Sequence, residues 1–339
     1  MGLFSFTQEI AIDLGTANTI IITGDKIVVD EPSIVALNRR TDKLIAIGKE
    51  AQLMRGKEHE DIKTIRPLRA GVIADFYAAE QMIRGMIKMV NNKNKWFSPS
   101  LRIVICIPSG STEVEIRAVR DSAEHAGGRD VYMVYEPMAA AIGIGLDVEA
   151  AEGNMIVDIG GGTTEIAVIA LGGIVSNKSI RIAGDDLTDD IVEYMGRQHN
   201  MKVGERTAET IKIKVGAAIT SLAEPPEDYV VFGPNRMTAL PMEVPVSYQE
   251  IAHCLEKSVS KIETAILNAL EQTPPELYAD IVRNGIYLTG GGALLRGLDK
   301  RLTDKINIPF HIADDPLHSV AKGTGIALKN ITKFNFLIR

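Results

Sequence analysis

Asp158-Ile-Gly-Gly-Gly-Thr-Thr-Glu165 is the stretch that decides the fold of this chain. The apolar run Met155–Val157 leads into it and Ile166–Ile169 leads out, which predicts two buried strands joined by a Gly-rich turn. Three glycines let backbone N–H groups approach an anion, and an aspartate at a strand end suits Mg²⁺ held through water. The stretch therefore predicts a phosphate-binding hairpin. The alternative is a tight glycine hairpin with a solvated aspartate.

The same pattern occurs near the N-terminus. The apolar strand Ile10–Ile12 ends at Asp13, and small residues at 15–19 lead into a second apolar strand, Ile20–Ile22. Two copies of one hairpin, separated by nearly half the chain, predict two similar domains that face each other. Each domain would contribute one phosphate loop, and a nucleotide would lie in the cleft between them.

Composition limits the kind of protein. A chain of 339 residues, 45% hydrophobic and 24% charged, is long enough for two soluble domains with cores of their own. The net charge of −7 argues against a general nucleic-acid binder. Cys106 and Cys254 fit no metal motif, so we expect reduced core residues in a cytosolic protein. No apolar run has the length of a membrane span, and residues 1–8 lack the basic region of a signal peptide.

Two apolar patches lie outside the predicted strands. The first comprises Leu3, Phe4 and Phe6, and the second is the pair Trp96 and Phe97 in a polar, cationic loop. Either patch could reach a membrane. The alternative for the first is an edge segment packed on the core, and for the second, rings folded back onto the preceding helix.

Two segments predict helices of small residues. One begins at Glu136-Pro137, because proline suits a first helical position, and the other spans Ser319–Lys329. Their alanines and glycines would let the two helices pack closely together. Glu136 would sit at the start of its helix and point out of the sheet. The alternative is an N-terminal acid favoured by the helix dipole.

Local signals set the limits of other helices. Thr112 and Glu115 predict a capping box for a helix that runs to about residue 126. Thr207 is the predicted N-cap of a helix that begins near residue 206. A long amphipathic helix is expected over about Tyr248–Glu271, and Thr289–Gly292 predicts a second glycine turn between a strand and a helix.

These motifs, in this order, resemble the actin-like ATPase superfamily, and they are similar to the motifs of its MreB family of bacterial actins from about residue 9 to about residue 330. The resemblance implies an α/β fold of duplicated, ribonuclease H-like domains, with four subdomains around a nucleotide cleft. The two large subdomains would comprise residues 1–35, 66–145 and 320–339, and residues 146–180 and 248–319. The small insertion subdomains would comprise residues 36–65 and 181–247.

The resemblance also implies ATP and Mg²⁺ in the cleft. Asp13 and Asp158 would support Mg²⁺ through water, and Glu136 and Thr163 would orient the attacking water. The phosphates would be held by Thr16, Ala17 and Asn18 from one side and by Gly160, Gly161 and Gly162 from the other. The adenosine would lie against Glu209, Thr210, Ile211, Lys212, Gly290, Gly291, Gly292, Ala293 and Leu294.

The implied function is a slow ATPase coupled to polymerisation into membrane-associated filaments that determine cell shape by organising cell-wall synthesis. The implied partners are other copies of the chain in protofilament pairs, the inner face of the cytoplasmic membrane and membrane proteins of cell-wall elongation, with no nucleic acid. The chain would be cytoplasmic and peripheral on the inner membrane surface. Two departures bear on membrane contact: only about eight residues precede the first strand, and residues 334–339 are unusually apolar.

Two other functions of the same superfamily are alternatives. A small-molecule kinase would need an acceptor pocket and a base for the hydroxyl proton, and the two insertions look too small for that. A chaperone would need a peptide-binding domain after residue 339. Sedimentation after addition of ATP separates the cytoskeletal function from both.

Overall fold

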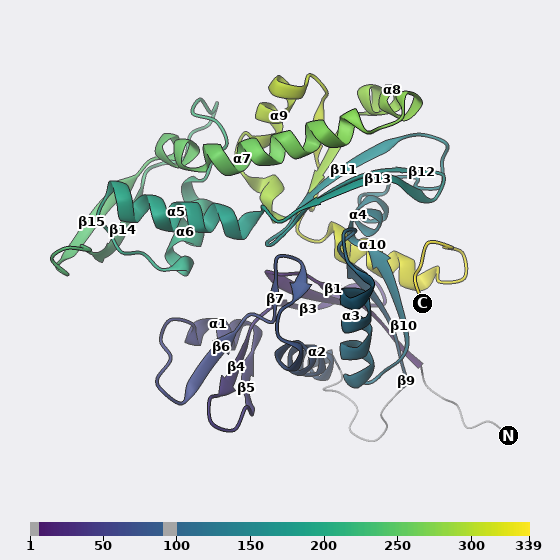
Figure 1. Cartoon of the computed structure of the whole chain (residues 1–339), viewed down its shortest axis with the longest axis horizontal. Coiled ribbons are helices and arrows are strands. Elements are labelled where there is room, and N and C mark those ends of the chain that lie inside the picture. Colours follow the sequence, from purple (N-terminus) through teal and green to yellow (C-terminus); the bar gives the residue numbers. More distant parts are fainter. Residues whose placement is uncertain (1–6, 91–99) are drawn as a thin grey trace.

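The computed structural model describes residues 7–90 and 100–339. The apolar patches at Leu3, Phe4 and Phe6 and at Trp96 and Phe97 lie outside the described residues. The chain folds into two α/β halves, each built on a five-stranded mixed sheet, with helices packed between the sheets and outside them (Figure 1).

The first sheet has the strand order β3-β2-β1-β9-β10. Its strands are β1 (Thr7–Leu14), β2 (Asn18–Thr23), β3 (Lys26–Pro32), β9 (Ser100–Ile107) and β10 (Gly128–Tyr135). The first three form an antiparallel meander, and β9 pairs in parallel with both β1 and β10. Ile10 and Ile12 join the core on one face of this sheet and Ala11 joins the core on the other. Burial of both faces explains why residues 10–12 of β1 are all apolar.

The second sheet repeats this plan with the order β13-β12-β11-β16-β17. Its strands are β11 (Asn154–Ile159), β12 (Thr164–Ala170), β13 (Gly173–Ile180), β16 (Ile286–Thr289) and β17 (Phe310–Ile312). Again the first three strands form an antiparallel meander, and the last two run parallel to the first. The two sheets therefore share one topology, as the repeated hairpin predicted.

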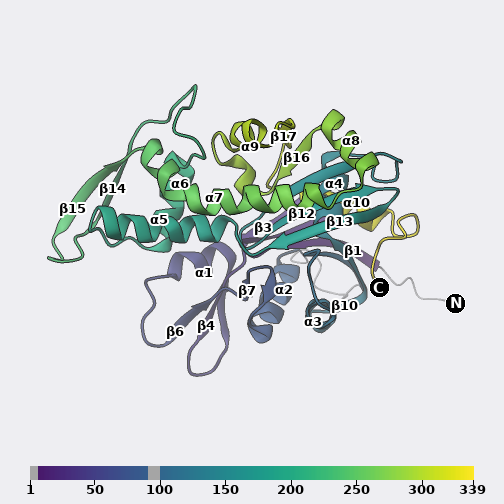
Figure 2. The ribbon, with the colours of Figure 1, turned by 45° about the horizontal axis from the view of Figure 1, so that its top comes forward.

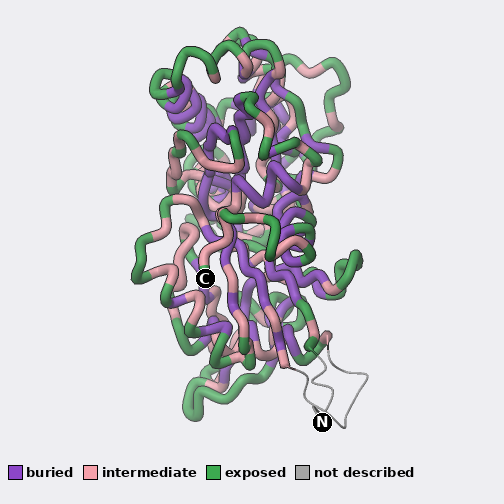
Figure 3. The backbone as a smooth tube through the Cα atoms, turned by 90° about the vertical axis from the view of Figure 1, so that its right-hand side faces the viewer, coloured by how far each residue is buried: buried purple, intermediate pink, exposed green. Residues whose placement is uncertain are grey.

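Helices cover the outer faces of both sheets. In the first half these helices are α2 (Phe76–Val90) and α3 (Glu113–His125), and in the second they are α7 (Tyr248–Glu271), α8 (Pro275–Asn284) and α9 (Leu298–Ile306). The predicted limits of α7 and the capping box of Thr112 and Glu115 at the start of α3 are confirmed. Figure 3 shows buried strands running through both halves, with exposed loops around them.

The two small-residue helices lie between the sheets (Figures 1 and 2). They are α4 (Glu136–Ile144) and α10 (Ser319–Lys329). A Cβ atom at Gly143 would lie 1.8 Å from the Ser319 carbonyl oxygen, and one at Gly323 would lie 1.7 Å from the Ala139 carbonyl oxygen. The two helices thus touch backbone to backbone, which confirms their predicted partnership. This crossing is the joint between the two halves.

Each half carries one insertion. The first is the sheet β5-β4-β6 with one short helix, and the second is a pair of helices with a two-stranded hairpin. The first comprises β4 (Val35–Asn38), β5 (Leu44–Ile47), α1 (Gly48–Met54) and β6 (Ile62–Ile65). The second comprises α5 (Gly184–Gln198), α6 (Glu205–Val215), β14 (Tyr229–Pro234) and β15 (Pro241–Val246). Both insertions lie at the left of Figure 1, one on each half.

One predicted helix start is wrong. The N-cap of α6 is Gly204, not Thr207, so the helix begins about one turn earlier than expected. Gly204 has an extended backbone (φ −88°, ψ 164°) and makes no side-chain cap, so the sequence carries no Ser, Thr, Asp or Asn signal at the true start.

The apolar C-terminal segment packs against the protein with its apolar side chains half-buried. Ile338 and Met133 exchange two backbone hydrogen bonds of 2.8 and 2.9 Å, so the tail pairs with β10. Phe334, Phe336 and Leu337 pack against the core between the two sheets. Within the described ranges, no helix combines the length and the apolar character needed to span a bilayer.

Candidate functional site

A cavity of about 1230 Å³ opens between the two halves. Its walls come from both glycine hairpins, from both insertions and from the Gly-rich turn η1 (Gly291–Leu294) that follows β16. The structure places these predicted residues on its wall: Asp13, Thr16, Ala17, Asn18, Glu136, Asp158, Gly160, Gly161, Gly162, Thr163, Glu209, Thr210, Lys212, Gly290, Gly291, Gly292 and Leu294. Residues far apart in the sequence are thereby brought to one cavity.

Two of the predicted residues do not line this cavity. Ile211 and Ala293 are both 0% exposed and belong to the hydrophobic core of the second half. On α6, Glu209, Lys212 and Ile213 share one face, because side chains three and four residues apart lie together on a helix. Ile211 lies on the opposite face, so the prediction of a continuous contact from Glu209 to Lys212 needs this correction.

The tips of the two glycine hairpins touch each other. A Cβ atom at Gly161 would lie 2.7 Å from the Ala17 Cβ, and one at Gly162 would lie 2.8 Å from the Thr16 side chain. The glycines are therefore required by this close approach as well as by room for an anion. Gly160 donates its N–H to the Thr163 carbonyl, 2.9 Å away, and so closes the turn.

Ser33 fixes the first hairpin tip. Its hydroxyl donates to the Gly15 carbonyl at 2.6 Å, and its N–H donates to the Ala17 carbonyl at 2.8 Å. On the other side of the tip, the Gly71 N–H donates to the Thr16 hydroxyl at 3.0 Å. The small residues at 15–17 are thus held in one conformation before any ligand binds.

Three carboxylates share the floor of the cavity. Burial raises the pKa of Asp158 to about 7, and repulsion from Asp13 and Glu165 adds to the shift. Burial likewise raises the pKa of Asp13 to about 6, against a hydrogen bond donated by the Cys106 thiol at 3.0 Å. The pKa of Glu136 is raised well above its usual range by burial and by its acidic neighbours.

This donor set suits a divalent cation held through water. The carboxylates repel one another, so a cation among them would relieve the cost of their ionisation. Within the described residues, no three His, Cys, Asp or Glu side chains are arranged to bind a metal directly. Mg²⁺ beside phosphates commonly keeps several water molecules and needs only one or two carboxylates.

The wall formed by α5 and α6 carries a polar network. Lys212 donates to the Gly184 carbonyl at 2.7 Å and to the Thr188 hydroxyl at 2.9 Å, and it pairs with Glu209 at 2.7 Å. Thr188 donates in turn to Glu209 at 2.6 Å. Leu294 and Leu317 also line the cavity, with about half of their surface exposed, 53% and 50%.

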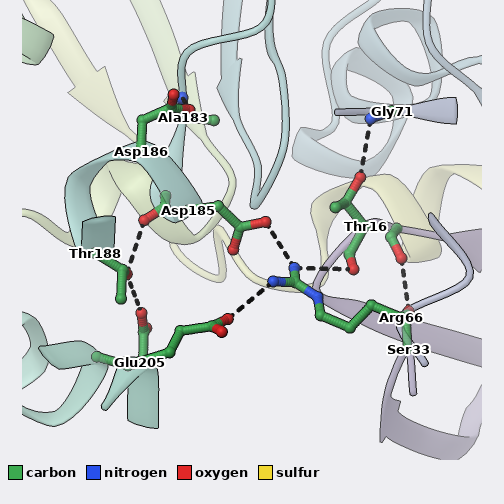
Figure 4. A network of polar contacts seen from close by, with 12 residues as sticks. Thr16, Ser33, Arg66, Gly71, Ala183, Asp185, Asp186, Thr188 and Glu205 are labelled. Carbon is green, nitrogen blue, oxygen red and sulfur yellow. Dashed lines mark hydrogen bonds and ion pairs between the residues drawn. The ribbon is translucent and has the colours of Figure 1, made fainter. Parts of the chain in front are cut away.

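Arg66 follows β6 of the first insertion and reaches across the cavity to the second insertion, a contact that was not predicted from the sequence. It donates to the Thr16 carbonyl at 3.3 Å and pairs with Asp185 at 2.6 Å and with Glu205 at 3.1 Å (Figure 4). Arg55 on the first insertion also pairs with Glu205. The only local signal was an arginine between apolar residues where the chain re-enters the core.

The family described as MreB/Mbl protein matches residues 7–336. The chain belongs to the MreB/Mbl family. One MreB/Mbl relative is the cell shape-determining protein Mbl of Bacillus cereus, 45% identical over 97% of this chain and 98% of the relative. Another is the cell shape-determining protein MreB of Escherichia coli K12, 45% identical over 96% of this chain and 94% of the relative.

Solved structures share the fold of this chain. MreB5 of Spiroplasma citri bound to AMPPNP superposes with a TM-score of 0.90 at 39% identity, covering 96% of this chain and 97% of that one. MamK in a double helical filament superposes with a TM-score of 0.80 at 20% identity, covering 95% of this chain and 99% of that one. These likenesses confirm the predicted actin-like fold.

Proposed function

We propose that this MreB/Mbl-family protein binds ATP with Mg²⁺ in the interdomain cavity, hydrolyses it slowly and polymerises into filaments that determine cell shape. One observation carries the proposal: glycine hairpins from both halves meet at a cavity floored by Asp13, Glu136 and Asp158. MreB5 of Spiroplasma citri, which shares the fold, was solved with AMPPNP, an analogue of ATP.

The two hairpins are suited to hold phosphates from opposite sides. Thr16, Ala17 and Asn18 face the cavity from the first half, and Gly160 to Gly162 face it from the second. Asp13 and Asp158 would hold Mg²⁺ through water. The bound cation would neutralise charge on the phosphates during transfer. The adenosine would lie between the α6 wall, with Glu209 and Lys212, and the glycine turn at 290–292 with Leu294.

Glu136 and Thr163 are proposed to orient the attacking water. Glu136 begins α4 directly after β10, so it belongs to the first half, whereas Thr163 belongs to the hairpin of the second. A cation nearby would favour the ionised form of Glu136, which burial and neighbouring acids disfavour. A carboxylate so placed can accept a proton from water, and positioning supplies the remainder of a slow hydrolysis.

Filament formation and cell-shape determination are proposed from the relatives. The Bacillus cereus and Escherichia coli relatives are cell shape-determining proteins, and MamK was solved as a filament. Membrane association through Leu3, Phe4, Phe6, Trp96 and Phe97, a position on the inner membrane surface, and contact with membrane proteins of cell-wall elongation remain part of the same proposal.

The test measures phosphate release and sedimentation with ATP and with ADP. We expect wild type to release phosphate slowly and to sediment with ATP. Asp158→Ala should lose Mg²⁺-dependent release, and Glu136→Ala should bind ATP but release phosphate roughly two to four orders of magnitude more slowly. Asp228→Ala, in an exposed loop, is the control and should match wild type. Wild-type activity in Asp158→Ala would refute the assignment of the cavity.

A further inference from the structure

Glu165 is a buried acid close to the proposed reaction site. It is 1% exposed and lies directly opposite Asp158 in the antiparallel register of β11 and β12. Side chains of such directly opposed residues point to the same face of a sheet, and like charges placed this way destabilise it. The position of Glu165 therefore requires compensating partners.

Those partners are serines. Glu165 Oε2 accepts from the Ser109 N–H at 3.1 Å and from the Ser109 hydroxyl, and its Oε1 accepts from the Ser179 hydroxyl at 2.6 Å. Hydrogen bonds to a carboxylate are shorter and stronger than those between neutral groups. Both carboxylate oxygens are therefore fixed.

The serines come from different halves of the molecule. Ser109 lies in the loop after β9 of the first sheet, and Ser179 lies on β13 of the second. Asn177, also on β13, donates to the Ser109 carbonyl at 3.3 Å. A Cβ atom at Gly110 would lie only 3.0 Å from the Ser179 Cβ, so the Ser109 loop rests closely on β13. Glu165 and its serines thus form one contact that joins the halves.

This contact lies next to both residues proposed to orient water. Thr163 is two residues before Glu165 in the second half. Ser109 follows β9, which pairs with β10, and β10 ends directly before Glu136 in the first half. A shift of the Ser109 loop relative to β12 would therefore change the separation of Glu136 and Thr163.

We propose that Glu165 is a positioning residue: held by Ser109 and Ser179, it keeps Glu136 of the first half and Thr163 of the second in register for hydrolysis. Glu165 acts through these two residues and does not touch the reacting atoms. The inference rests on the proposed ATPase function, and it implies that hydrolysis requires the two halves to be in contact at Glu165 and its serines.

The experiment compares Ser109→Ala, Ser179→Ala and Glu165→Gln in the full chain, with Ser176→Ala as the control. Ser176 lies on the same strand as Ser179, and its hydroxyl has no hydrogen-bond partner among the described residues. Phosphate release gives kcat and KM, and AMPPNP titration gives nucleotide affinity. Sedimentation measures the amount of polymer, so that variants are compared at equal polymer. Each serine variant should lower kcat roughly tenfold, the worth of about one hydrogen bond to a charged group. KM and AMPPNP affinity should stay within about twofold.

A double-mutant cycle separates positioning from general stability. In the Glu165→Gln background, removing either serine hydroxyl should have less effect on kcat than in wild type, because the contact is already weakened. If wild type hydrolyses ATP and both serine variants keep its kcat, or Ser176→Ala loses as much, the inference is wrong while the proposed function stands. If wild type releases no phosphate, both are wrong. If Glu165→Gln fails to fold, the two serine variants still test the inference by themselves.

Discussion

Asp13 and Asp158 are costly to ionise in the folded protein. Their pKa values are raised by burial to about 6 and about 7, whereas in an unfolded chain an aspartate titrates near ~3.9. Between about pH 4 and pH 7 the folded state therefore binds more protons than the unfolded state. The contribution of these two groups to the free energy of unfolding is largest below this range and is lost as pH rises through it.

We therefore expect the nucleotide-free protein to lose thermal stability between about pH 4 and pH 7, and Asp158→Asn to lose less. The reason is that asparagine cannot ionise, so the variant lacks one of the two buried acids whose pKa is raised. Melting temperature followed by circular dichroism across this range is the measurement, with Asp228→Asn as the exposed control. If Asp158→Asn and wild type show an equal pH dependence of the melting temperature, ionisation of buried Asp158 is not its cause.

Single residues were predictable where the signal is local. Asp13, Asp158 and the hairpin glycines follow from a strand and a turn that are contiguous in the sequence. Arg66 was not predictable, because its partners Asp185 and Glu205 lie 119 and 139 residues away. Ile211, which the resemblance placed beside the nucleotide, lies in the core because it is on the face of α6 opposite Glu209 and Lys212.

The α4–α10 crossing depends on small residues in both helices, because these let the two backbones come into contact. Gly323→Ala would place a methyl group within 1.7 Å of the Ala139 carbonyl oxygen, in helix backbone that cannot move aside easily. We expect a loss of about 1–3 kcal/mol or more in the free energy of unfolding, measured by urea denaturation. Gly325→Ala on the same helix is the control, because its methyl group would meet only the Ile22 side chain at 3.2 Å. Equal stability of the two variants would show that the helices can separate at little cost.

Whole elements were predicted better than their ends. The two glycine hairpins, α7 and the capping box of α3 follow from hydrophobic period and from side chains that bond to the nearby backbone. The start of α6 was not predictable from the sequence, because Gly204 begins that helix without a side-chain cap. The pairing of the tail with β10 also escaped prediction, because one bridge at Met133 leaves no periodic signal.

At the scale of the whole molecule, Arg66 links the end of the first insertion to the second insertion across the cavity. Its side chain is 16% exposed, while its partners Asp185 and Glu205 are 38% and 40% exposed. Such pairs are partly screened by salt, so the connection can open. We expect Arg66→Ala to release a fluorescent ATP analogue roughly tenfold faster in stopped-flow experiments at low salt.

Salt supplies a second measurement of the same connection. Release from wild type should accelerate as sodium chloride is raised, whereas release from Arg66→Ala should change little. Arg129→Ala, an exposed arginine on β10, is the matched control and should behave as wild type. If Arg66→Ala shows the same salt dependence as wild type, these ion pairs do not hold the cavity closed.

The pairing of Ile338 with Met133 has a consequence for how copies of the chain can associate. Strand β10 is an outer strand of its sheet, and an open strand edge is a template for another strand. At Met133 the chain itself occupies that edge with two hydrogen bonds. Sheets of neighbouring copies cannot join there into a continuous cross-β fibre, whose backbone ladder makes it nearly irreversible. Association through side-chain surfaces instead leaves each copy able to dissociate intact and be used again.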